Sequence, residues 1–289
     1  MNIKNQFSKN LLFILIYGLL GCFWVFVSSC KNEPLEPVLF KKLFSEATGI
    51  TFNNQIQAFE GDSLNPSLYD PMYNGAGVGV GDFNNDGLLD LFFAGNVVSS
   101  ELYLNQGNFK FSNATKKANL LTKRWCSGVS VVDINQDGWL DIYVSVSGLE
   151  NINNPKQRAN LLFINQGIKN GKSDKNFVPT FQEEAEAYGL ADVGMSTQAA
   201  FFDFDHDNDL DCYVLTNAVE MTGRNRVRQK KIAGEGPSTD RLYVNSGVKI
   251  EPSTTPKNPI FQLADVEKGI QKEGYGLGLA ICDLNDDGW

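Results

Sequence analysis

The sequence predicts an all-β fold of repeated units, a β-propeller, and three observations lead to that prediction. An Asp-rich loop recurs at 82–90, 133–141 and 203–211, and a fourth copy begins at 283 and is cut by the chain end. After each complete loop, apolar residues alternate with period two, as in a strand with one buried face. The stretches between loops differ in length, which is more typical of propeller blades than of a tight solenoid.

Each complete unit is expected to supply four antiparallel strands. A Gly-rich leading strand precedes the loop, a second strand follows it, a third closes on an Asn-x-Gly turn, and a fourth begins with Phe. Glycines in the leading strands indicate close backbone approach, as expected near a propeller axis. The leading strands are predicted at 75–81, 128–132, 199–202 and 274–281, the third strands at 102–107, 162–167 and 242–247, and the closing strands at 111–120, 181–190 and 261–270.

The segment 43–50 resembles a closing strand whose three partners are absent before it. We expect it to complete the last blade and close the ring. No helix longer than a turn or two is expected after residue 30, because apolar alternation dominates that part of the chain.

The N-terminus is typical of an export signal. Lys4 and Lys9 precede an apolar run at 11–27, and Val27-Ser28-Ser29-Cys30 resembles the lipobox of bacterial lipoproteins, in which the Cys is lipidated. The predicted division is a signal peptide at 1–29, a tether at 30–38 and a propeller at 39–289 that is truncated at its C-terminus. A rival lipobox ends at Cys22 and would leave an apolar mature N-terminus. An uncleaved membrane anchor is the other alternative.

Composition excludes some classes of protein. The 289 residues are 42% hydrophobic and 11% aromatic, enough for a real core, and the formal charge of −9 disfavours nucleic-acid binding. Cys126, Cys212 and Cys282 lie in apolar stretches, so we expect small buried side chains and no disulfide framework.

The Asp-rich loops are predicted to bind a metal ion. Like-charged pairs such as Asp82 and Asp86 cost roughly 4 kcal/mol at ~4 Å and an effective dielectric of ~20, so a cation must offset them. Positions 1, 3 and 5 offer side-chain oxygens, position 6 permits a sharp turn, position 7 offers a carbonyl, and position 9 another carboxylate. This all-oxygen set suits Ca²⁺ better than Mg²⁺ or Zn²⁺. An EF-hand is excluded because Phe93, Val144 and Val214 stand where its bidentate Glu would be.

Two alternatives apply to single loops. Asn-Asp-Gly alone could be a hairpin turn, but repetition between apolar strands argues against that. In the third loop Asn208 replaces Gly, and Asn tolerates positive φ, so binding should survive. His206, at position 4, is interpreted as a solvated residue.

Together, the Asp loop, the Gly-rich strand, Asn-x-Gly and the Phe-led closing strand resemble FG-GAP/VCBS repeats, such as those of integrin α-subunit propellers. The arrangement is most similar, from about Phe40 to Trp289, to bacterial envelope proteins with a C-terminal ASPIC/UnbV domain, relatives of cartilage acidic protein. The resemblance implies a seven- or eight-bladed propeller with Ca²⁺ on one rim and no catalytic residues. The implied ligands are Asp82, Asn84, Asp86, Leu88 and Asp90; Asp133, Asn135, Asp137, Trp139 and Asp141; Asp203, Asp205, Asp207, Asp209 and Asp211; and Asp283, Asn285 and Asp287.

The expected function is that of a calcium-binding surface module of the cell envelope, with a protein or glycan ligand and no nucleic acid. The membrane is reached through the lipid on Cys30, at the outer membrane, facing the cell surface or the periplasm. An insertion with Arg224, Arg226, Arg228, Lys230 and Lys231 could dock an anionic partner or be a solvated loop. The alternatives are a calcium-dependent polysaccharide lyase or hydrolase, and a purely structural or adhesive envelope protein.

Overall fold

The computed structural model describes residues 39–56, 70–148, 155–168, 177–217, 229–248, 256 and 258–285. The chain divides into two compact units, Met1–Leu43 and Phe44–Trp289. Of the first unit only residues 39–43 are described, so the predicted signal peptide, tether and Cys30 lie outside the described residues. Among the described residues, no helix combines the length and the hydrophobicity that a membrane crossing requires.

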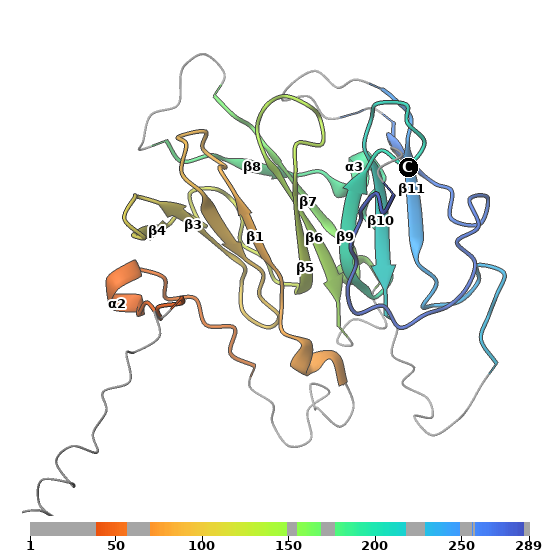
Figure 1. The fold of residues 1–289 in the computed structure, drawn as a ribbon, viewed down its shortest axis with the longest axis horizontal. Coiled ribbons are helices and arrows are strands. Elements are labelled where there is room, and N and C mark those ends of the chain that lie inside the picture. The colour runs from red at the N-terminus through yellow and green to blue at the C-terminus, as the bar shows by residue number, and fades with distance from the viewer. Residues whose placement is uncertain are drawn as a thin grey trace, which may run out of the picture. The chain divides into compact units, whose positions relative to one another are not determined.

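The second unit is nearly all β, as predicted. Its described strands form three antiparallel four-stranded sheets, each in simple sequence order, and Figure 1 shows them side by side. Sheet one consists of β1 (Val78–Gly81), β2 (Asp90–Phe93), β3 (Glu101–Asn105) and β4 (Phe111–Asn113). Sheet two consists of β5 (Trp125–Val132), β6 (Asp141–Ser147), β7 (Leu161–Asn165) and β8 (Phe181–Glu183). Sheet three consists of β9 (Ser196–Phe202), β10 (Asp211–Thr216), β11 (Arg241–Asn245) and β12 (Phe261–Leu263). These four-stranded units match the blades of the predicted β-propeller.

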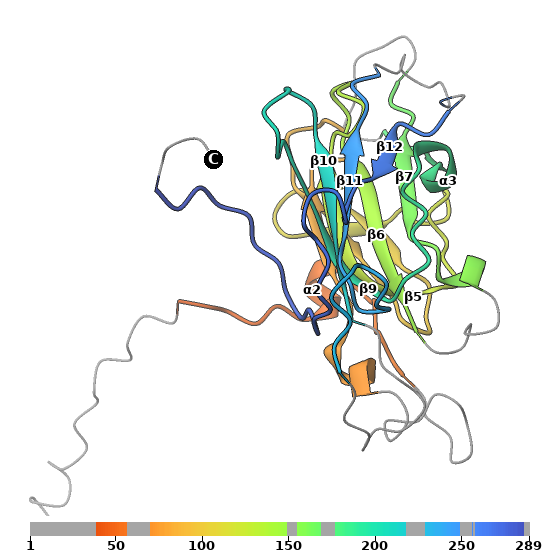
Figure 2. The ribbon, with the colours of Figure 1, turned by 90° about the vertical axis from the view of Figure 1, so that its right-hand side faces the viewer.

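The remaining elements are short. Two helices of one turn, α2 (Ser45–Thr48) and α3 (Ala185–Tyr188), and two 3₁₀ turns, η1 (Asp70–Asn74) and η2 (Pro155–Arg158), occur among the described residues. Figure 2 shows α3 beside β7 and β12.

The leading strands approach one another as their glycines predicted. A Cβ on Gly77 would lie 2.7 Å from the backbone nitrogen of Val129, and one on Gly128 would lie 2.4 Å from the carbonyl oxygen of Thr197. Real Cβ atoms do not come so close, so glycine is required where one leading strand crosses the next. Ser127 Oγ adds a hydrogen bond of 2.6 Å to the carbonyl oxygen of Ser196.

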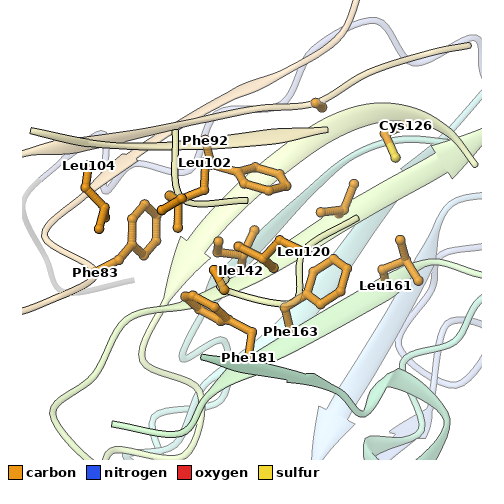
Figure 3. Packing of buried hydrophobic residues seen from close by; sticks show 14 of the residues in the cluster. Phe83, Phe92, Leu102, Leu104, Leu120, Cys126, Ile142, Leu161, Phe163 and Phe181 are labelled. Carbon is orange, nitrogen blue, oxygen red and sulfur yellow. The ribbon is translucent and has the colours of Figure 1, made fainter. Parts of the chain in front are cut away.

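The apolar cores lie between sheets rather than within them. Figure 3 shows the core between sheets one and two, where Phe92 and Leu102 meet Ile142 and Phe163. A second core joins sheets two and three around Tyr143, Val214 and other buried residues. Sheet two is therefore buried on both faces, and β6 is buried along its whole length.

This arrangement corrects the predicted burial of sheet one. The period-two alternation after loop one predicts that Leu89, Leu91 and Phe93 form the buried face. In the structure Leu89 is 60% exposed, and the fully buried residue is Phe92. Phe92 points to sheet two, whereas Phe93 lies on the other face, where Phe52 stacks on it with ring centroids 5.2 Å apart. In sheets two and three a neighbouring sheet packs on the predicted face, so the predicted residues, such as Ile142 and Val214, are buried there. In sheet one the neighbouring sheet packs on the opposite face.

The closing strands are shorter than predicted. Each continues for three residues only, and the chain then forms a turn that returns to an apolar residue such as Leu120 or Leu190, both fully buried. The closing strand is the last strand of its sheet, and Leu120 and Leu190 pack in the cores shared with the next sheet. The chain therefore leaves its own sheet by a turn after the closing strand.

The segment 43–50 is likewise a turn and not a strand. Its helix α2 ends at Gly49, whose φ of 78° matches the 85° of Gly189 after α3. A Cβ on Gly49 would lie 2.5 Å from the carbonyl oxygen of Phe111, and one on Gly189 would lie 2.5 Å from that of Phe261. The segment thus meets sheet one as a closing turn meets the next sheet. Ring closure by this segment stays a prediction.

Two further predictions failed. The fourth leading strand, predicted at 274–281, is not a strand, because a strand forms by pairing and no described strand pairs with this stretch. Cys282, in the same stretch, is exposed, whereas Cys126 and Cys212 are buried as expected.

Candidate metal-binding loops

Three described loops connect a leading strand to the next strand of its sheet: loop one (82–90), loop two (133–141) and loop three (203–211). Position 6 is left-handed in each, with φ of 87° at Gly87 and Gly138 and 70° at Asn208. The prediction that Asn208 would adopt positive φ is confirmed. Position 4 is left-handed too, which the sequence did not reveal, with φ of 54° at Asn85, 57° at Gln136 and 63° at His206.

The Asp at position 1 shapes the turn. In loop one, Asp82 Oδ1 accepts the backbone N–H of Asp86 at 3.0 Å and Oδ2 accepts that of Gly87 at 2.7 Å. The same pair of bonds recurs at Asp133 and at Asp203. Each carboxylate oxygen has a second lone pair that remains available to a cation.

The Asp at position 9 is buried in all three loops. In loop two, Asp141 Oδ2 accepts the N–H of Ile134 at 3.0 Å, and Oδ1 accepts that of Asn165 at 2.7 Å. Asp90 and Asp211 make the corresponding two bonds. Burial raises the pKa of Asp141 to about 8 and that of Asp90 to about 7, although the backbone hydrogen bonds lower both. A nearby cation would favour the ionised form of these carboxyl groups.

The Asn of each Asn-x-Gly turn holds its loop in place, a role that the sequence analysis missed. Asn105 Nδ2 donates to the carbonyl oxygen of Leu89 at 2.8 Å, and its Oδ1 accepts the N–H of Gly107 at 2.9 Å. Asn165 and Asn245 repeat both contacts in their own sheets. The signal was present in the sequence, because Asn stands at the same place in every unit.

Positions 3 and 5 lie next to each other. In loop one, Asn84 Nδ2 donates to Asp86 Oδ2 at 3.1 Å, and loop two repeats this between Asn135 and Asp137. In loop three, carboxylate oxygens of Asp203, Asp205 and Asp211 all lie within 4.8 Å of one another. Loop three thus brings carboxylates of positions 1, 3 and 9 together, and metal binding there stays a prediction.

Loops one and two are joined by hydrogen bonds. Asn85 Nδ2 donates to the carbonyl oxygen of Gly138 at 3.0 Å, and Asn165 Nδ2 donates to that of Phe83 at 2.9 Å. Neighbouring Asp loops therefore lie along one edge of the three sheets.

Two predicted sites, the fourth loop and the basic insertion, are only partly covered by the described residues. In the fourth loop Asp283 and Asn285 are exposed and the N–H of Asn285 donates to Asp283 Oδ1 at 3.2 Å, while Asp287 lies outside the described residues. Lys230 and Lys231 of the basic insertion are exposed, and Arg224, Arg226 and Arg228 lie outside the described residues.

The donor chemistry of the loops fits calcium. The side chains at positions 1, 3, 5 and 9 are carboxylates or amides, and the three carboxylates that meet in loop three are oxygen donors. A Gly or Asn in left-handed conformation lets such a loop fold around one point. Zinc prefers nitrogen and sulfur donors, which these positions do not supply.

Comparison with known proteins agrees with this geometry over part of the chain. No curated protein matches the chain significantly. The FG-GAP-like repeat matches residues 82–144, from the start of loop one into β6 beyond loop two, so this stretch carries a repeat of the FG-GAP class.

Proposed function

We propose that the chain is a calcium-binding β-propeller of the cell envelope that serves as a surface interaction module. FG-GAP repeats typically serve as interaction modules rather than enzymes, and the repeat at 82–144 supports the coarser part of this proposal. The finer assignment, to lipid-anchored envelope proteins of the ASPIC/UnbV type with an unidentified protein or glycan ligand, is part of the proposal and rests on the sequence resemblance.

The observation that carries the calcium assignment is the group of Asp203, Asp205 and Asp211, whose oxygens lie within 4.8 Å of one another. Three carboxylates at that separation repel one another strongly unless a cation lies among them. Because loops one and two share the bond pattern of loop three at positions 1 and 9, the same ion is proposed for all three loops.

Calcium in these loops would act on stability and not on chemistry. An ion that binds only the folded state stabilises it by about 2.7 kcal/mol at a hundred times its dissociation constant. Since each loop joins two strands near a sheet edge, bound ions would fix the surface that the loops present.

Calorimetric titration of the full-length protein with CaCl₂ tests the proposal. We expect binding to several sites and a rise in melting temperature that a chelator reverses. Asp203→Asn should remove one site, because it takes a carboxylate from the centre of loop three; Glu46→Gln, at an exposed position in α2, is the matched charge control. Absence of binding heat together with an unchanged melting temperature would refute calcium binding.

A further inference from the structure

A cavity of about 450 Å³ lies between loops two and three. Asn135 and Gln136 line it from loop two, and Asp207, Asn208 and Asp209 line it from loop three. Tyr188, at the end of α3, and residues of the Asn-x-Gly turn of sheet three complete its wall. The volume is sufficient for an ion with several of its water ligands.

Two residues that line this cavity, Tyr188 and Asp209, each have a buried polar atom with no hydrogen-bond partner in the described part of the chain. Tyr188 is 1% exposed, and its hydroxyl is buried without a partner. Asp209 Oδ1 is likewise buried without a partner. An unsatisfied buried polar group costs about 1–3 kcal/mol, and more when it is charged, so these two atoms favour a polar ligand in the cavity.

The charge of the cavity indicates the kind of ligand. Loop three has five Asp residues, at 203, 205, 207, 209 and 211, against three each in loops one and two. Among the described residues, none that lines the cavity is basic. Burial, with the neighbouring carboxylates of Asp207 and Asp211, raises the pKa of Asp209 to about 6. With one divalent ion bound at the centre of each loop, loop three would keep a larger net negative charge than loop one or loop two.

The side chain of Asp209 cannot be assigned to the loop centre. At position 7 the loop offers its carbonyl oxygen to a central ion. The carboxylate instead lies beside Gly247, where Oδ2 is 3.4 Å from the position of an added Cβ. Loops one and two have Leu88 and Trp139 at position 7, so this second carboxylate is specific to loop three.

We propose that the cavity between loops two and three holds a second divalent cation, with the Asp209 carboxylate as its anchoring ligand and Asp207 beside it. A water ligand of this cation would donate to the Tyr188 hydroxyl. Carboxylate and water oxygens in a flexible loop suit calcium, which accepts protein and water ligands together. This inference deepens the proposed function and rests on calcium binding by the chain.

Calorimetric titration of the full-length Asp209→Asn protein with CaCl₂ tests the site. The substitution keeps the backbone carbonyl and the size of the side chain, and we expect the number of bound ions to fall by one while the remaining sites keep their affinity. Glu46→Gln should leave the number unchanged. If Asp203→Asn loses an ion and Asp209→Asn loses none, the second cation is refuted and calcium binding by the loops stands. If no variant and no wild-type protein binds calcium, both proposals fall.

Tyr188→Phe provides a second test that separates binding from structure. Removing an unpartnered buried hydroxyl should leave the melting temperature in chelator unchanged or higher, since no protein hydrogen bond is lost. In calcium the gain in melting temperature should be smaller than in the wild type, because a water ligand loses its partner. A gain equal to that of the wild type would contradict the site.

Discussion

The two junctions between neighbouring Asp loops are built differently although the loops share one motif. Between loops one and two, Asn85 and Asn165 donate hydrogen bonds across the sheets to the carbonyl oxygens of Gly138 and Phe83. Between loops two and three there is a cavity of about 450 Å³ with unpartnered polar groups on its wall. The hydrogen bonds of the Asp at position 1 recur in all three described loops, whereas the contacts between neighbouring loops differ.

The difference begins at position 4. Asn85 in loop one has a short amide that reaches the next loop, whereas loop two has Gln136 at the same place, and Gln136 lines the cavity instead. Asn85 and Gln136 have nearly the same left-handed φ, so the different contacts with the next loop come from their side chains. Neighbouring loops with equal ligands can therefore differ in how firmly each is tied to the next.

The largest effect is expected from Asp141→Ala, in loop two, the loop that both junctions share. The change leaves the N–H groups of Ile134 and Asn165 without acceptors in a buried place, which should cost about 3 kcal/mol of unfolding free energy. Urea denaturation of the full-length protein in chelator measures it. Asp137→Ala is the control, because Asp137 is only partly buried, and a loss as large for Asp137 would contradict the ranking.

A smaller effect separates Asn165→Ala from Asn245→Ala. Both variants lose the bond to their own loop, but only Asn165 also donates to Phe83 in the neighbouring sheet. We expect Asn165→Ala to be the more destabilising by about 1 kcal/mol, the net value of one hydrogen bond. Equal losses in parallel urea titrations would show that the bond to Phe83 contributes nothing to the junction.

Much of the fold followed from the sequence because the units repeat. Four strands per unit, the place of each loop and the glycines at the crossing of leading strands were all predicted, since each pattern occurs several times and each copy supports the others. Burial was harder to predict. Phe92 and Phe93 are adjacent and equally apolar, and only the position of sheet two determines which of them is buried.

The candidate site shows the same limit. The proposed ligand positions came from the spacing of the Asp residues, and the tolerance of Asn208 for positive φ came from its chemistry. The contacts of Asn165 with Phe83 and of Tyr188 with the cavity could not, because they join residues far apart in sequence that meet only when sheets pack. Closing turns were taken for strands because an apolar residue recurs nine positions after each leading Phe.

The smallest effects are expected from glycine at position 4, where Asn85→Gly and Gln136→Gly should change stability in opposite directions. Asn85→Gly removes the bond to Gly138 and should cost about 0.5–1 kcal/mol of unfolding free energy, since Asn bears positive φ with little strain. Gln136→Gly removes the strain of a left-handed Gln, which is worth about 1 kcal/mol. The greater flexibility of Gly in the unfolded chain costs somewhat less, so the free energy of unfolding should rise by up to about 0.5 kcal/mol. Thermal unfolding of both full-length variants in chelator gives the two signs. A loss at both positions would mean that Gln136 stabilises its junction too, and the contrast between the junctions would then rest on the cavity alone.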